Sequence, residues 1–180
     1  QGNYQEAAKL YQQSMEIEKE LRNKSGIAGT LHQLGMIHQD QGNYQEAAKL
    51  YQQSMEIEKE LRNKSGIATT LHQLGMIHQH QGNYQEAAKL YQQSMEIEKE
   101  LGNKSGIANT LGQLGRLHEE QDKDYTSALE KYMRAYLIFK ELQAPEAELA
   151  QKDMARIKEN IGEDAFKAAI EEIRRRNDDI

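Results

Sequence analysis

Histidines are the side chains of this sequence best suited to chemistry, and their spacing argues against a metal or catalytic centre. Six are present. His72 and His80 lie about two helical turns apart, whereas helical zinc ligands stand at i and i+4. The sequence has no cysteine, and it contains no glycine-rich phosphate loop, nucleophile elbow or zinc motif. Its carboxylates are scattered, as on solvated helix faces. We therefore predict a protein that is not an enzyme and that has no cofactor and no metal.

The histidines divide into two expected environments. Three share a helix face with apolar residues, and we predict that they are core residues with a hydrogen-bonded ring nitrogen: His38, His78 and His118. The other three are expected on an exposed stripe: His32, His72 and His80. An exposed imidazole has a pKa of about 6.5, so this second group would make binding sensitive to pH.

The histidines recur because the chain is built from three near-copies of one 40-residue unit, at residues 1–40, 41–80 and 81–120. The first two copies differ only at Gly29/Thr69 and Asp40/His80. The third departs from the second at seven positions: Arg62/Gly102, Thr69/Asn109, His72/Gly112, Met76/Arg116, Ile77/Leu117, Gln79/Glu119 and His80/Glu120. A fixed period of this length indicates a stacked repeat array, in which the core is a strip between neighbouring units.

Composition favours an all-helical protein and excludes several partner classes. The 180 residues include no valine and one proline, Pro145, and show no alternating apolar pattern. The net charge of −6, with both signs interspersed, argues against nucleic-acid binding. No apolar run reaches the roughly 18–20 residues that cross a bilayer. We expect no membrane association and a cytoplasmic location, and the start at Gln1 in mid-repeat suggests a fragment of a longer protein.

Helix-ending and helix-capping residues divide each unit into two helices. Gly42 suits the left-handed residue that ends a helix, and Asn43 with Glu46 forms a capping box for the next one. Ser65 is the expected N-cap of the following helix, and Asp124 the cap in the fourth unit. We therefore expect about nine helices. A solenoid over 1–161 would contain an unpaired (orphan) helix 3–22, the helix pairs 25–62, 65–102 and 105–142, and a helix 146–161. A C-terminal capping helix would follow within 162–180.

The helix that follows Ser25 has two distinct faces at about 100° per residue. One arc carries the packing residues Ile27, Ala28, Leu31, Leu34, Gly35 and His38. Gly35 in that arc would let a neighbouring helix approach closely, at a cost in helix propensity of about 1 kcal/mol. A separate arc of roughly 100° carries positions 29, 32, 36, 39 and 40. Most of the divergence among the copies falls on these five positions.

The chain resembles a tetratricopeptide-repeat protein over about residues 1–160. The family spacing is reproduced by Leu31, Leu34, Gly35, His38, Gly42, Tyr44, Ala47, Tyr51 and Ser54, and recurs in the next copy. The period of 40 exceeds the usual 34 and is similar to that of kinesin light chain and Pins-type repeats. The resemblance implies an all-α, right-handed superhelical solenoid of antiparallel helix pairs.

The resemblance also implies a binding groove. In this family the first helix of each unit lines the concave side, where ligands usually bind, and the groove positions coincide with the five divergent ones. We call these fifteen residues the groove stripe: Gly29, His32, Met36, Gln39, Asp40, Thr69, His72, Met76, Gln79, His80, Asn109, Gly112, Arg116, Glu119 and Glu120. Neutral drift on exposed positions is the alternative explanation, although the exposed face of the second helix is invariant.

Three functions are compatible with this pattern. The first is an adaptor module that binds a peptide or helix of a protein partner in the groove. The second is a structural spacer or self-associating solenoid, because the orphan first helix would leave apolar surface open for end-to-end stacking. The third is the sensor segment of a larger signalling protein.

Overall fold

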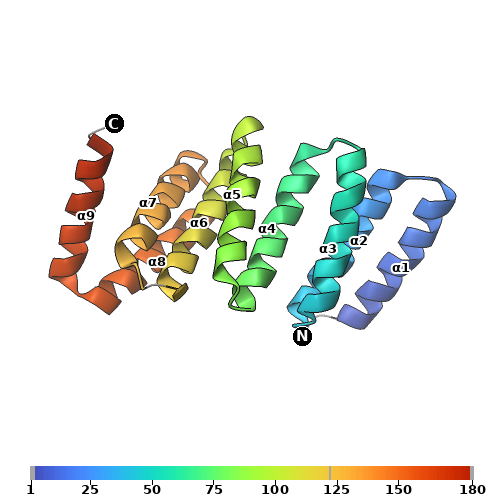
Figure 1. Ribbon diagram of the computed structural model, residues 1–180, viewed down its shortest axis with the longest axis horizontal. Helices are drawn as coiled ribbons and strands as arrows, with labels where there is room; N and C mark the ends of the chain where they lie inside the picture. Colours follow the sequence, from blue (N-terminus) through green and yellow to red (C-terminus); the bar gives the residue numbers. More distant parts are fainter. Residues whose placement is uncertain (1–2, 122, 179–180) are drawn as a thin grey trace. The chain divides into compact units, whose positions relative to one another are not determined.

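The computed structural model describes residues 3–121 and 123–178. Over these residues the chain forms nine helices and no strand, which confirms the all-helical prediction (Figure 1). The helices are α1 (Tyr4–Glu20), α2 (Lys24–Asp40), α3 (Tyr44–Glu60), α4 (Lys64–His80), α5 (Tyr84–Glu100), α6 (Lys104–Gln121), α7 (Tyr125–Glu141), α8 (Glu146–Ile161) and α9 (Glu163–Asp178). We call α2, α4, α6 and α8 the first-type helices, and α1, α3, α5 and α7 the second-type helices.

Contacts divide the chain into two compact units, residues 1–97 and 98–180, with the boundary close to the end of α5. In the first unit α1 packs on α2, α2 on α3 and α3 on α4. In the second unit α6 packs on α7 and α7 on α8, and α9 contacts both α7 and α8. Within each unit, most of these contacts therefore join helices that are neighbours in sequence, as Figure 1 shows for the hairpin of α1 and α2.

One tyrosine per repeat forms the centre of the core. Tyr51, Tyr91 and Tyr132 are each 0% exposed. Each ring lies against a glycine of the preceding first-type helix: a Cβ added to Gly35 would stand 2.7 Å from Cε1 of Tyr51. The same contact recurs at Gly75 and Gly115. The predicted close approach at Gly35 is thus confirmed, because only a residue without Cβ leaves room for the ring.

The turns explain one difference between the copies that lies outside the groove stripe. Gly42 has φ +76°, as predicted for a residue that ends a helix. After α1 and α3, Arg22 and Arg62 also take positive φ, at 54° and 55°. The third copy places Gly102 at this point with φ +66°. The exchange of Arg62 for Gly102 therefore removes the strain of a side chain in the left-handed region.

The helix caps differ in part from those expected. Asn23 and Asn63 cap α2 and α4, since each Oδ1 accepts the backbone N–H three residues on, at 3.1 and 3.3 Å. The prediction of Ser65 as the cap was wrong, and the serine lies inside the first turn. Asn43 precedes α3 but makes no side-chain capping bond. Asp124 does cap α7, with Oδ1 3.0 Å from the N–H of Ser127.

Two glutamates at equivalent positions of the repeat are buried, against the expectation of solvated acidic residues. Glu58 and Glu98 are 8% and 5% exposed. Each carboxylate lies beside a glycine in the first turn of the next helix, and a Cβ on Gly66 would stand 2.5 Å from Cδ of Glu58. The positive end of a helix dipole favours a negative charge at this point. The equivalent Glu18 is half-buried and accepts a hydrogen bond of 2.9 Å from the hydroxyl of Thr30.

Substitution of Gly35 and of Gly29, both in α2, should have opposite effects on stability. Gly35→Ala drives a methyl group into the ring of Tyr51, so we expect a net loss of about 2 kcal/mol in the free energy of unfolding despite the better helix propensity of alanine. Gly29→Ala is the matched control, because no atom lies within 4 Å of its added Cβ. It should stabilise the protein by about 0.5–1 kcal/mol. Denaturant titration measures both, and a Gly35→Ala protein as stable as wild type would refute the proposed packing.

Candidate functional site

The groove stripe lies along the first-type helices α2, α4 and α6 and separates into an outer and an inner layer. The outer residues are exposed: Gly29, Met36, Asp40, Thr69, His80, Asn109 and Glu120. The inner residues are half-buried, apart from Gln79, which is buried: His32, Gln39, His72, Met76, Gln79, Gly112, Arg116 and Glu119. A partner approaching these helices would meet the outer layer first.

The inner layer supports the buried tyrosines. The hydroxyl of Tyr51 donates a hydrogen bond to Oε1 of Gln39 at 2.9 Å, and Tyr91 does the same to Gln79 at 2.8 Å. The ring of His32 packs on Tyr51 with centroids 5.0 Å apart, and His72 lies 5.4 Å from Tyr91. Positions 32 and 39 of the stripe therefore form the floor of the surface in the first unit.

Burial changes the expected titration of two histidines. Desolvation lowers the pKa of His32, and it lowers the pKa of His72 to about 4. Both rings are therefore neutral near pH 7, which corrects the expectation that they titrate near 6.5. His80 is exposed, and its ring stacks on that of Tyr44 with 8° between the ring planes and 5.5 Å between the centroids.

In the third copy a carboxylate, Glu119, replaces the glutamine that accepts the tyrosine hydroxyl. The hydroxyl of Tyr132 donates to its Oε2 at 3.1 Å. Arg156, from α8, bonds both oxygens of Glu119, with Nε 3.0 Å from Oε1 and Nη2 2.8 Å from Oε2. Its Nη1 also lies 2.6 Å from Oδ1 of Asp153, which is 5% exposed. The hydrogen bond from Arg156 is the main reason that the pKa of Glu119 is lowered.

The second unit also brings three stripe residues together around a small cavity. Asn109, Gly112 and Arg116 of α6 line a space of about 70 Å³ with Tyr132 of α7 and Asp153 of α8. The residues of α8 were not predicted as part of any site. The exchange of Gln79 for Glu119 was the one sequence feature that could have indicated them, because a partly buried carboxylate requires a nearby cation.

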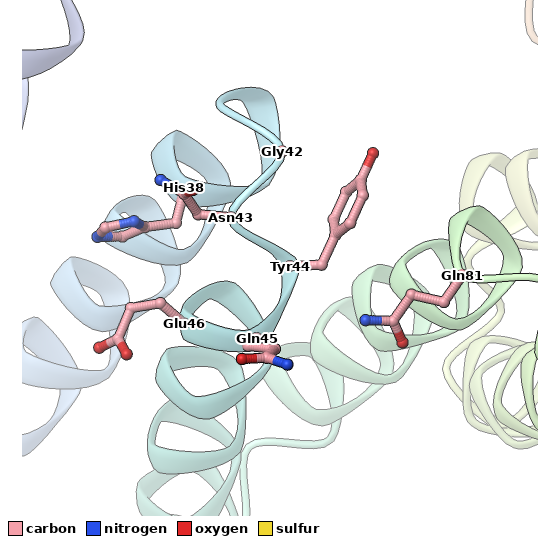
Figure 2. Close-up of a pocket in the computed structure, with 7 residues that line it drawn as sticks. All are labelled: His38, Gly42, Asn43, Tyr44, Gln45, Glu46 and Gln81. Atoms are coloured by element: carbon pink, nitrogen blue, oxygen red, sulfur yellow. The ribbon is translucent and has the colours of Figure 1, made fainter.

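A second hollow, in the first unit, involves residues outside the groove stripe. It measures about 580 Å³ and surrounds the turn between α2 and α3, as Figure 2 shows. Its lining includes His38, Tyr44 and Glu46, and Gln81 from the end of α4. In Figure 2 the Tyr44 ring points away from His38 and Glu46. These residues recur unchanged in the next copy, so this hollow shows none of the divergence that marks the stripe.

Two of the packing-face histidines, His38 and His78, each have one ring nitrogen without a hydrogen bond. Nδ1 of His38 and Nδ1 of His78 are buried without a hydrogen-bond partner. The cap residue near His38, Asn43, directs its amide toward Gln41 instead, at 3.4 Å. After the third copy the cap residue is Asp124 of the fourth unit, and its Oδ2 lies 4.0 Å from Nδ1 of His118.

Comparison with protein families settles which family the helix pairs represent. The tetratricopeptide repeat model matches residues 1–60 and 66–141. The chain belongs to the tetratricopeptide repeat family. Comparison with curated proteins gives no match.

Solved structures share the fold of this tetratricopeptide-repeat chain at low sequence identity. BtubC (BKLC) from P. vanneervenii has a TM-score of 0.79 at 20% identity, over 97% of this chain and 73% of that one. A putative kinesin light chain from Podosopora anserina with nearly identical TPR-like repeats has a TM-score of 0.68 at 23% identity, over 96% and 86%. The N-terminal domain of stress-induced protein-1 from C. elegans has a TM-score of 0.55 at 16% identity, over 73% and 97%.

Two further observations concern the described part of the chain. Among residues 3–121 and 123–178, no group of three or more His, Asp or Glu side chains is placed to hold a metal ion. None of the helices described there has the length and apolar character needed to span a membrane.

The buried His72 should make stability depend on pH. Its pKa of about 4 in the folded state lies below the 6.5 of the unfolded state, so the unfolded chain binds more protons between these values. This contribution to stability is complete above pH 6.5 and is lost as the pH falls toward 4, by up to about 3 kcal/mol. In His72→Leu the loss of stability over this window should be smaller by that amount. Urea titrations from pH 4 to 8 measure it, and equal slopes below pH 6.5 would contradict the assignment.

The ion pair in the second unit should show strong coupling. Arg156→Ala leaves Glu119 and Asp153 without their cation, and we expect a loss of about 2 kcal/mol. Glu119→Gln restores the residue of the other copies, so in the Arg156→Ala background it should recover about 1 kcal/mol. A double-mutant cycle measures this coupling. Lys104→Ala is the control, because its partner Glu141 is exposed and the pair should contribute less than about 0.5 kcal/mol. If Arg156→Ala and Lys104→Ala lose the same free energy of unfolding, Arg156 has no special role in stability.

Proposed function

We propose that the groove stripe binds a peptide or helix of a protein partner and that the chain acts as an adaptor. The observation that carries this proposal is the position of the divergence among the copies. Five of the seven positions at which the third copy differs from the second lie on this one stripe. Membership of the tetratricopeptide repeat family, whose members generally mediate protein interactions, supports the same function.

A comparison with the second-type helices argues against neutral drift. The residues Gln45, Lys49, Gln52 and Glu56 of α3 are exposed, as are several members of the stripe. They are nevertheless identical in all three copies. Exposure alone therefore does not produce divergence in this chain, whereas a surface that contacts different parts of a partner would diverge from copy to copy.

The methionines and the charged residues of the groove stripe suggest what kind of segment would bind. In the first unit, Met36 is 38% exposed and Met76 is half-buried, and methionine adapts to irregular apolar surfaces. In the second unit, Arg116 and Glu120 present opposite charges. A partner segment with both apolar and polar side chains fits this surface. The accompanying assignments are a non-enzymatic role and a cytoplasmic location, which rest on the absence of catalytic motifs and of cysteine.

Positive charges introduced at the two methionines of the groove stripe should weaken binding. A random peptide library displayed on phage and selected on the immobilised chain supplies the ligands. For the selected peptides, Met36→Lys with Met76→Lys should weaken binding by about tenfold or more, because two apolar contacts are replaced by hydrated charges. Gln12→Lys with Gln52→Lys adds the same charge on exposed second-type positions, so its affinity should stay within about twofold of wild type. Circular dichroism checks that both variants stay folded, and unchanged binding by the methionine variant would refute the proposal.

Self-association remains a second candidate, because α1 leaves apolar side chains in solvent. Leu10, Ile17 and Leu21 are 57%, 57% and 72% exposed. The equivalent Leu50 and Ile57 of α3 are half-buried. Sedimentation over a range of protein concentrations discriminates between the candidates. A mass that rises with concentration, and that returns to the monomer value in Leu10→Gln with Ile17→Gln, would favour end-to-end stacking.

A further inference from the structure

The third copy lacks a ring that the first two copies place on the groove floor. His32 and His72 cover Tyr51 and Tyr91 with an imidazole at 5.0 and 5.4 Å. Gly112 occupies the same position in α6, and no atom lies within 4 Å of a Cβ added there. The cavity of about 70 Å³ lies at this point. The exchange of histidine for glycine thus leaves a space comparable to one side chain.

Apolar and aromatic residues form part of the lining of this cavity, and Asn109, Gln113, Arg116, Glu146 and Asp153 form the rest. Tyr132, Ala135 and Phe139 of α7 line it, together with Ala108 of α6 and with Leu149 and Ala150 of α8. Tyr132 keeps its hydroxyl bonded to Glu119, so its ring and not its polar atom is what a ligand would meet.

Two of the three charged residues that line the cavity, Asp153 and Arg116, lie near charges of opposite sign, and the third, Glu146, is exposed to solvent. Asp153 is paired with Arg156 at 2.6 Å. The positive charge of Arg116 helps to lower the pKa of Glu119. An additional charged group in the cavity would have to be desolvated, and the remaining charge there, that of Glu146, is exposed to water. The space favours a neutral side chain.

We propose that the cavity at Gly112 is an anchor pocket that receives one aliphatic side chain, of the size of valine or leucine, from the segment bound in the groove. This inference rests on the proposed groove function and makes it specific. The volume is less than half of the roughly 150 Å³ of an apolar cavity that admits benzene, so an aromatic ring is too large for it.

Xenon tests the apolar character of the pocket without any peptide. In crystals of the full chain pressurised with xenon, wild type should bind the gas beside Gly112 and Tyr132. Gly112→His refills the space with the ring that the other copies carry, so it should exclude xenon. Ala168→His adds the same imidazole to an exposed position of α9 and should leave the xenon site occupied. A wild-type cavity that takes up no xenon overturns the proposal.

Peptides selected from the phage library test the occupant. The expected result is one peptide position fixed as valine, leucine or isoleucine, with binding about ten- to a hundredfold weaker in Gly112→His and unchanged in Ala168→His. Peptides that bind Gly112→His as well as wild type, or that show no aliphatic position, overturn the pocket while the groove function stands. Equal losses in both histidine variants also overturn it. If no peptide binds wild type, the groove function itself fails, and the pocket assignment fails with it whatever xenon does.

Discussion

The burial of one tyrosine per repeat against a glycine is the constraint on which the rest of this structure depends. The ring of Tyr51 reaches within van der Waals range of the α2 backbone only because Gly35 has no Cβ. A buried hydroxyl must then find a hydrogen-bond acceptor. Position 39 of the unit supplies it, as glutamine in two copies and as Glu119 in the third. The packing of a second-type helix thus determines which residue type a groove-facing position can hold.

This constraint also accounts for the changes near the end of the array. A carboxylate in place of the glutamine introduces a charge that is 12% exposed, and such a charge is costly without a cation. Arg156 of α8 supplies the cation and holds the buried Asp153 at the same time. The divergence at Glu119 therefore belongs to a local network within the second unit. Met36 and Asp40 are exposed, so divergence at these positions changes the surface of the stripe rather than its packing.

Much of the fold followed from local patterns, whereas several details of the site did not. Helical periodicity and the glycines at 35 and 42 predicted the helix pairs, the close contact and the turns, because each feature depends on residues near in sequence. The bond between Tyr51 and Gln39, and the one between Arg156 and Glu119, join different helices, and no local pattern contains them. The burial of Glu58 was missed for the same reason, since it depends on room left by Gly66 in the next helix.

Position 32 of the unit shows that a floor position can change without loss of the core. Tyr132 is 0% exposed although Gly112 provides no ring to cover it, and Tyr51 and Tyr91 are equally buried beneath their histidines. Burial of the tyrosine therefore comes from the glycine contact and from the neighbouring helices, and the imidazole is not required for it. A position that touches the core but is not needed by it can vary at little cost to the fold. Such a position is suited to carry specificity, because a change there reshapes the floor while the helices stay where they are.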